Sequence, residues 1–192
     1  TEVFDQLPFR DVATWNAMIK ANGENHKGNM AIQCFEEMQK QGVNPNGITF
    51  ICLLAACSHA SLVSEGRKYF EQMIEHGIKP TWDHYTCMVD LLGRSGYVCE
   101  AEQFAEGRNC LQCEEILRTL LNASKIHGEV DVGERCFQQL LRLNKDDAGS
   151  YLLMADIYTK AGKFGDANNI EEMRIHAEVK SIGKKLIQRS LS

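Results

Sequence analysis

A 35-residue internal spacing constrains the fold of this chain more than any other feature. The large residues that recur are Trp15, Phe50, Tyr85, Leu117 and Tyr151. Sixteen positions after each comes a small residue: Ala31, Gly66, Ala101, Gly133 and Ala167. The first three large residues are 35 apart and the last two are 34 apart. Periods of this length indicate a repeat protein, in which each unit buries its apolar face against its neighbours.

Each unit is predicted to be a helical hairpin. In the first unit, apolar residues at helical spacing predict one helix over 12–22 and another over 29–41, with a Gly/Asn turn at 22–25. Gly42 is expected as a left-handed C-cap and Pro45 as the end of the unit, because neither continues a helix. The small residues are expected where two helices cross, since a bulky side chain would push the axes apart. The expected fold is therefore all-α, a right-handed α-solenoid of helix-turn-helix repeats.

Composition fits a folded chain and limits its partners. Hydrophobic residues make up 44% and aromatics 8%, and no apolar run approaches the ~20 residues needed to cross a bilayer. The net charge of −5 weighs against an unspecific nucleic-acid coat, since phosphate contacts supply most of the affinity of such proteins. It leaves open a protein that recognises individual bases on a polar face. The chain begins with Thr1 rather than Met, so we expect a fragment or a processed chain.

Eight cysteines are present, an even number as in a disulfide framework. Most of them lie within helical apolar patterns, where free cysteine behaves as a small hydrophobe. A chain of this length has enough core to fold without staples. We expect reduced, mostly buried cysteines in a reducing compartment.

Several motifs resemble pentatricopeptide repeat proteins, specifically plant-type editing factors whose repeats alternate in length. The segment 3–12 (VFDQLPFRDV) with 14–19 (TWNAMI) is similar to the family's junction between a short and a standard repeat. Thr49-Phe50 with 54–59 (LAACSH) resembles its long repeat, and 84–94 (HYTCMVDLLGR) its last short repeat. Two extension (E) motifs are suggested by further matches: 126–128 (IHG) with 133–135 (GER), and Ser150-Tyr151 with Ile157-Tyr158 and Ala161-Gly162.

The resemblance implies a division of the chain. Its parts are the end of a preceding repeat at 1–11, three repeats at 12–46, 47–81 and 82–113, two E-motif hairpins at 114–180, and a basic tail at 181–192. Two departures stand out. The Met-Pro and Trp expected before the first E motif are replaced at 106–113, and the segment that leads into a C-terminal deaminase domain is absent after Lys180. These departures leave catalysis by this chain unsupported.

The family recognises one base through the fifth residue of the first helix and the last residue of the repeat. Helical repeats can recognise single bases in this way. In the first repeat the pair is Asn16 and Asn46, whose amides both donate and accept; the resemblance implies a pyrimidine, cytosine before uracil. Alternatively, Asn16 solvates a helix start and Asn46 is a turn residue. Two other pairs follow: Ile51 with Thr81, which we assign to packing or a partner, and Thr86 with Cys113, where Thr86 is a candidate purine contact. In the two E units the corresponding residues are Arg118 and Leu152, and they predict no base.

A zinc site is considered and disfavoured. Cys110 and Cys113 form a C-x-x-C, and His127 with Glu129 an H-x-E. Zinc deaminases have the H-x-E first, so the order here is reversed, and no second C-x-x-C completes a structural site. No phosphate-binding loop or nucleophile elbow is present. We therefore expect no enzyme activity, cofactor or metal.

The resemblance implies sequence-specific binding of single-stranded organellar RNA upstream of an edited cytidine. The E motifs would dock a deaminase or other editing-factor proteins, in cis or in trans, in a mitochondrion or chloroplast; neither a membrane nor a small-molecule substrate is expected. The main alternative is a tetratricopeptide-like scaffold that binds proteins and no RNA. The proline thirty residues after the aromatic, as from Trp15 to Pro45, favours the first interpretation. The Lys/Arg-rich tail is expected to fray or to touch phosphate.

Overall fold

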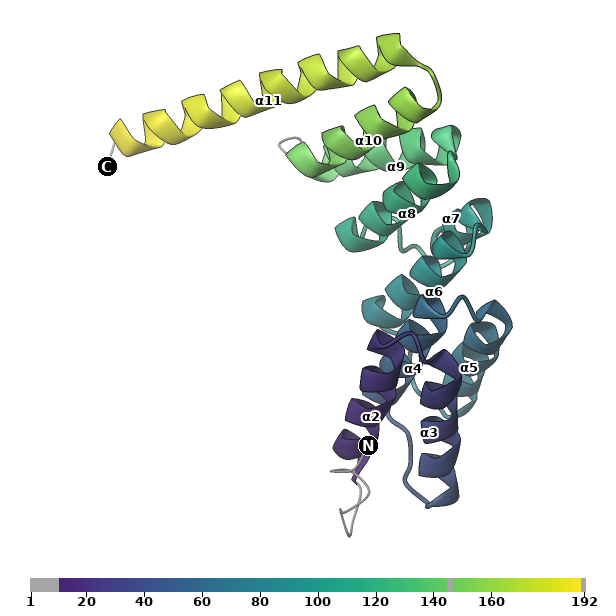
Figure 1. Ribbon diagram of the computed structural model, residues 1–192. Helices are drawn as coiled ribbons and strands as arrows, with labels where there is room; N and C mark the ends of the chain where they lie inside the picture. The colour runs from purple at the N-terminus through teal and green to yellow at the C-terminus, as the bar shows by residue number, and fades with distance from the viewer. Residues whose placement is uncertain (1–10, 145–146, 191–192) are drawn as a thin grey trace. The chain divides into compact units, whose positions relative to one another are not determined.

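The structure is a computed structural model that describes residues 11–144 and 147–190, with side chains described as far as Val179. Within these residues it contains ten α-helices and no strand (Figure 1). The all-α repeat fold expected from the sequence is confirmed. The chain forms two compact units, Thr1–Ser95 and Gly96–Ser192. The expected preceding repeat at 1–11 lies, except for Asp11, outside the described residues.

The first unit is built from two helical hairpins and one further helix. The helices are α2 (Val12–Glu24), α3 (Gly28–Lys40), α4 (Gly47–His59), α5 (Val63–Glu75) and α6 (Trp82–Arg94). The first helices of the repeats, α2, α4 and α6, pack side by side, and α3 and α5 pack against them as a second layer (Figure 1). Asp11 caps α2 by accepting from the Thr14 N–H at 2.8 Å, which fixes where the first helix begins.

The repeated large residues form the core of this unit, as expected. Trp15 and Phe50 are fully buried, and Tyr85 is half-buried. Phe35 of α3 packs edge-on against Phe50, with ring centroids 5.6 Å apart. A Cβ added at Gly66 would lie 2.1 Å from Leu91 Cδ2. Gly66 therefore stands at a close helix crossing, as its place in the repeat predicts.

One local prediction was wrong. The turn expected at 22–25 begins later, because α2 continues to Glu24. Gly23 is therefore a buried helical residue, and a Cβ there would lie 2.8 Å from Ala56 Cβ and 3.0 Å from Ala56 Cα. Its role is to let α2 and α4 approach each other. The expectation for Gly42 is confirmed, since its φ of 75° is left-handed.

The second unit continues with five helices. They are α7 (Val98–Glu106), α8 (Glu114–His127), α9 (Val130–Leu143), α10 (Ala148–Lys160) and α11 (Phe164–Ser190). Within the unit α8 packs on α7, α9 and α10, and α10 packs on α11. The buried residues include Leu117, Phe137 and Tyr151, with the Phe137 and Tyr151 rings edge-on at 5.3 Å.

The last helix runs through the boundary expected at 181, since its backbone is helical to Ser190. The side chains of the basic cluster at Lys180, Lys184, Lys185 and Arg189 lie outside the described residues. None of the described helices is both long and apolar enough to pass through a lipid bilayer.

Candidate nucleic-acid interface

Asn16 and Asn46 lie together in the first unit. Asn16 is the fifth residue of α2, and Asn46 immediately precedes α4. Asn16 Nδ2 donates a hydrogen bond of 3.3 Å to Asn46 Oδ1. The packing of α2 against α4 thus brings together two amides that are thirty residues apart in the sequence.

The helix cap orients both amides. Asn46 Oδ1 accepts from the Thr49 backbone N–H at 3.0 Å and caps α4, so the amide oxygen must face the helix and not the nitrogen. Asn16 consequently turns its NH₂ toward that oxygen. Asn16 Oδ1 is left buried, with no hydrogen-bond partner among the described residues, in a residue only 7% exposed. A buried acceptor without a donor costs about 1–3 kcal/mol, so a donor that reached this oxygen through a small turn of the side chain would be stabilising.

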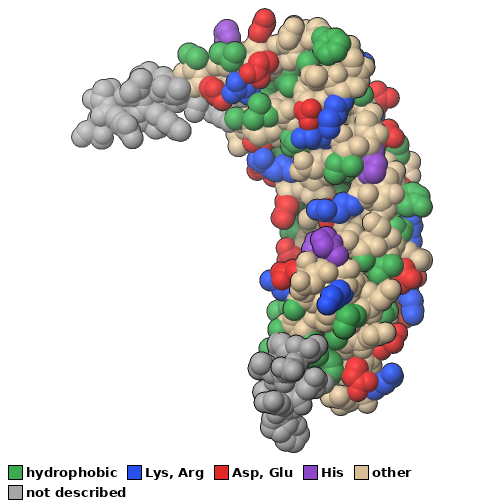
Figure 2. Space-filling model, in the orientation of Figure 1, with side chains coloured by type: hydrophobic (Ala, Val, Ile, Leu, Met, Phe, Trp, Pro, Cys, Tyr) green, Lys and Arg blue, Asp and Glu red, His purple; other side chains and the backbone are tan. Residues whose placement is uncertain are grey.

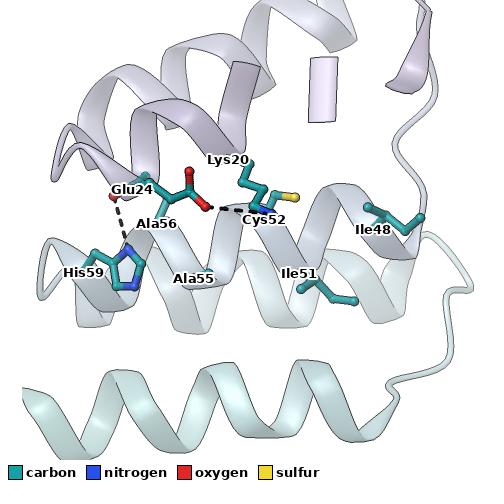
Figure 3. A pocket seen from close by; sticks show the side chains of 9 residues that line it. Lys20, Glu24, Ile48, Ile51, Cys52, Ala55, Ala56 and His59 are labelled. Atoms are coloured by element: carbon teal, nitrogen blue, oxygen red, sulfur yellow. Dashed lines mark hydrogen bonds and ion pairs between the residues drawn. The ribbon is translucent and has the colours of Figure 1, made fainter. Parts of the chain in front are cut away.

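An apolar groove of about 300 Å³ lies between α2 and α4 (Figure 3). Ile48 and Ile51 line one end, and His59 lies at the other. Lys20 pairs with Glu24 at 3.8 Å along the rim, and His59 Nδ1 donates to the Gly23 carbonyl at 3.2 Å. Asn16 lies one turn before Lys20 on α2, so the amide pair stands next to the end of the groove that carries Ile48.

The second expected pair combines a residue of the groove with a helix cap. Ile51 is half-buried and lines the groove, while Thr81 caps α6. The Thr81 backbone N–H donates to His84 Nδ1 at 3.1 Å, so Nδ1 is an acceptor. His84 Nε2 must then carry the hydrogen and donate to the Gly47 carbonyl, 3.0 Å away. His84 is therefore a neutral link between the starts of α6 and α4, 1% exposed, and burial lowers its pKa.

The third expected pair falls in different units. Thr86 is on α6 in the first unit, half-buried, and its hydroxyl donates to the Trp82 carbonyl at 2.9 Å. Cys113, its expected partner, is the N-cap of α8 in the second unit. The hydroxyl hydrogen of Thr86 is thus used within its own helix. The hydroxyl oxygen can still accept a hydrogen bond from a ligand.

The corresponding positions in the second unit carry an ion pair. Arg118 is the fifth residue of α8, and Asp147 immediately precedes α10. Arg118 Nη2 lies 3.1 Å from Asp147 Oδ2 and also pairs with Glu114. The hydrogen bond to Glu114 and the charge of Asp147 raise the pKa of Arg118. Leu152, the fifth residue of α10, is 55% exposed.

The structure joins none of the eight cysteines in a disulfide. Cys57, Cys110 and Cys136 are buried, and Cys99 is exposed. Burial raises the pKa of Cys57 and Cys136 to about 12, so both are protonated and unreactive at neutral pH. No cluster of three or more metal-binding side chains occurs in the described part of the chain.

Charge on the surface is mixed. On the face shown in Figure 2, acidic and basic side chains are interspersed and neither sign gathers into a broad patch. Binding of nucleic acid by this face would therefore depend on specific polar contacts more than on a general phosphate attraction.

Family comparisons match three segments of the chain. Residues 10–59 match the PPR repeat family, residues 48–78 the PPR repeat, and residues 127–187 the E motif. A pentatricopeptide repeat-containing protein of Arabidopsis thaliana, At5g15300, is 40% identical over 97% of this chain and 34% of its own length. CRR2, a chloroplastic pentatricopeptide repeat-containing protein of the same plant, is 39% identical over 91% of this chain and 27% of its own length. The chain thus spans about a third or less of these relatives.

Solved structures agree on the fold. PPR10 from maize superposes with a TM-score of 0.78 at 23% identity, over 89% of this chain and 24% of that protein. PPR10 in complex with an 18-nt psaJ RNA element gives 0.80 at 23% identity, over 88% and 25%. The solved structures thus share the fold, while the matched segments and the relatives at 39–40% identity show that the chain belongs to the pentatricopeptide repeat family and carries its E motif.

Proposed function

We propose that the first unit binds single-stranded RNA and that Asn16 and Asn46 contact one pyrimidine base, cytosine before uracil. The observation that carries the proposal is the buried Asn16 Oδ1 without a partner, beside an apolar groove. A base edge supplies the missing donor, and its ring has apolar side chains to lie against. The structural likeness to PPR10, whose complex contains RNA, supports the same ligand class.

The chemistry of the pair favours a base with an N–H next to an acceptor. Asn16 Oδ1 accepts, while the NH₂ of Asn46 donates because its oxygen caps α4. Cytosine offers N4–H₂ beside N3, and uracil offers N3–H beside O2 or O4. Thr86 is proposed as a further contact, to a purine, through its hydroxyl oxygen.

The E-motif unit is proposed to dock a deaminase, supplied in cis or in trans, or other proteins of an editing complex. Support comes from apolar side chains that stay exposed on α10 and α11: Leu152 at 55%, Met173 at 45%, Ile175 at 49% and Val179 at 65%. In this proposal the chain itself is not an enzyme; it places a target cytidine for C-to-U editing in an organelle. Several relatives are named as chloroplastic, and the proposal covers mitochondria equally.

The test is a binding panel of short single-stranded RNAs that differ at one nucleotide, measured by fluorescence anisotropy. We expect wild type to prefer a pyrimidine and Asn16→Ala to weaken binding to that RNA about tenfold, as for about 1.4 kcal/mol. Asn25→Ala is the matched control, because the Asn25 side chain donates to the Ala21 carbonyl at the exposed end of α2, away from Asn46. Equal affinity for all of the RNAs, or no binding to any of them, would favour the protein-binding scaffold instead.

A further inference from the structure

The hydroxyl of Thr49 is placed to hold the base-contacting amide in one orientation. Thr49 is fully buried at the third position of α4. Its Oγ1 accepts from the Asn46 backbone N–H at 3.0 Å and donates to Asn46 Oδ1 at 3.1 Å. Thr49 therefore touches both the backbone and the side chain of Asn46, although the repeat register assigns it no functional role.

These contacts decide which end of the Asn46 amide faces outward. An amide can turn over by exchanging its oxygen and nitrogen. In the turned-over state Asn46 Nδ2 would meet the Thr49 N–H and the Asn16 NH₂, which are both donors. The Thr49 hydroxyl donates a third hydrogen bond to Oδ1 in the observed state, while its own oxygen already accepts from the Asn46 backbone N–H. The orientation of Asn46 in turn leaves Asn16 Oδ1 as the unpaired acceptor.

The same arrangement recurs at other helix starts. Thr14 Oγ1 donates to Asp11 Oδ1 at 2.7 Å before α2, and the hydroxyl of Ser150 donates to Asp147 before α10. Asp11 and Asp147 carry carboxylates, whose two oxygens are equivalent, so a hydroxyl there has no orientation to select. At Asn46 the capping group is an amide, whose two ends differ. There the hydroxyl contact also bears on which end, oxygen or NH₂, faces outward.

We propose that Thr49 is a positioning residue for base discrimination: it presents the NH₂ of Asn46 and the oxygen of Asn16 to the base, without contacting RNA. This inference rests on the proposed function, since it concerns the same amide pair. Without the hydroxyl, the observed orientation keeps the Thr49 N–H but loses one of its hydrogen bonds. The turned-over orientation then becomes more populated, and bases with the opposite donor–acceptor pattern are accepted more readily. Discrimination should fall while overall affinity changes less.

The test uses the 192-residue chain with Thr49→Val, which keeps the shape and removes the hydroxyl, and Thr49→Ser, which keeps the hydroxyl. Affinities are measured for RNAs that carry cytosine, uracil, adenine or guanine at one position. We expect Thr49→Val to reduce the ratio of best to worst affinity about fivefold, as for about 1 kcal/mol. Thr49→Ser should restore most of the ratio.

Thr14→Val is the matched control, because it removes a hydroxyl from the same helix position on a carboxylate cap. Circular dichroism melting establishes that each variant is folded at the assay temperature. If wild type discriminates among the four RNAs and Thr49→Val has the same ratio of best to worst affinity, the role of Thr49 is overturned. The proposal of RNA binding would stand in that case. An equal loss of discrimination in Thr14→Val would also overturn it, because the effect would then come from a weakened helix start in general. A wild type without discrimination would overturn the proposed function together with this inference.

Discussion

The two units place different chemistry at equivalent positions. In the first, the fifth residue of α2 and the residue before α4 are amides, Asn16 and Asn46, joined by one neutral hydrogen bond. In the second, the fifth residue of α8 and the residue before α10 are Arg118 and Asp147, joined as an ion pair. The amide pair retains an unused acceptor, whereas Arg118 is shared between two carboxylates. The same helical frame can thus hold a polar pair with an unused acceptor or an ion pair whose guanidinium has two partners.

The two units also differ in how tightly their helices approach at a glycine. A Cβ at Gly23 of the first unit would meet the backbone of Ala56 at 3.0 Å, while one at Gly133 of the second would meet only the tip of Ile157 at that distance. We expect Gly23→Ala to lower the free energy of unfolding by about 2 kcal/mol, from overpacking. Gly133→Ala should stay within about 1 kcal/mol of wild type, because alanine also favours the helix. Urea unfolding curves measure both, and equal losses would refute this difference.

The ion pair of the second unit should serve stability and not RNA binding. Arg118→Met leaves the largely buried Asp147 carboxylate without its guanidinium, and we expect a loss of about 1 kcal/mol that shrinks with added salt. Urea unfolding at low and high ionic strength measures the loss. Base discrimination should be unchanged; a changed preference would show that this pair also contacts RNA.

A smaller effect concerns pH and the first unit alone. Because burial lowers the pKa of folded His84, the unfolded chain takes up its proton more readily, so stability falls as the pH drops below the ordinary value of 6.5. The His84 contribution is at most about 0.7 kcal/mol between pH 7 and pH 6. His84→Gln keeps a donor and an acceptor but does not titrate, and its unfolding free energy should depend less on pH. Ser150, at the equivalent position of α10, cannot titrate. Identical pH profiles for wild type and His84→Gln would contradict the assignment.

Much of the fold follows from the sequence because its determinants are local. Apolar spacing and Gly42 located the first hairpin to within two residues. The role of Gly23 was missed because a glycine beside asparagines resembles a turn, and only the packing of α2 on α4 makes it a contact point.

The candidate site was predictable in part. The identities of Asn16 and Asn46 came from the repeat register and the family resemblance. Their mutual hydrogen bond, the unpaired Asn16 oxygen and the burial of Thr49 depend on how two helices are rotated against each other. A sequence pattern does not fix that rotation.

The most direct test exchanges one kind of pair for the other. The double variant Asn16→Arg/Asn46→Asp gives the first unit the ion pair of the second, and the carboxylate introduced before α4 would still accept from the Thr49 N–H and cap that helix. Affinities for the four single-nucleotide RNA variants are compared with those of wild type, with a melting curve as the check on folding. We predict a folded protein that no longer distinguishes the four bases at this position. A folded double variant with the base preference of wild type would contradict the claim that the open amide pair is the recognition site.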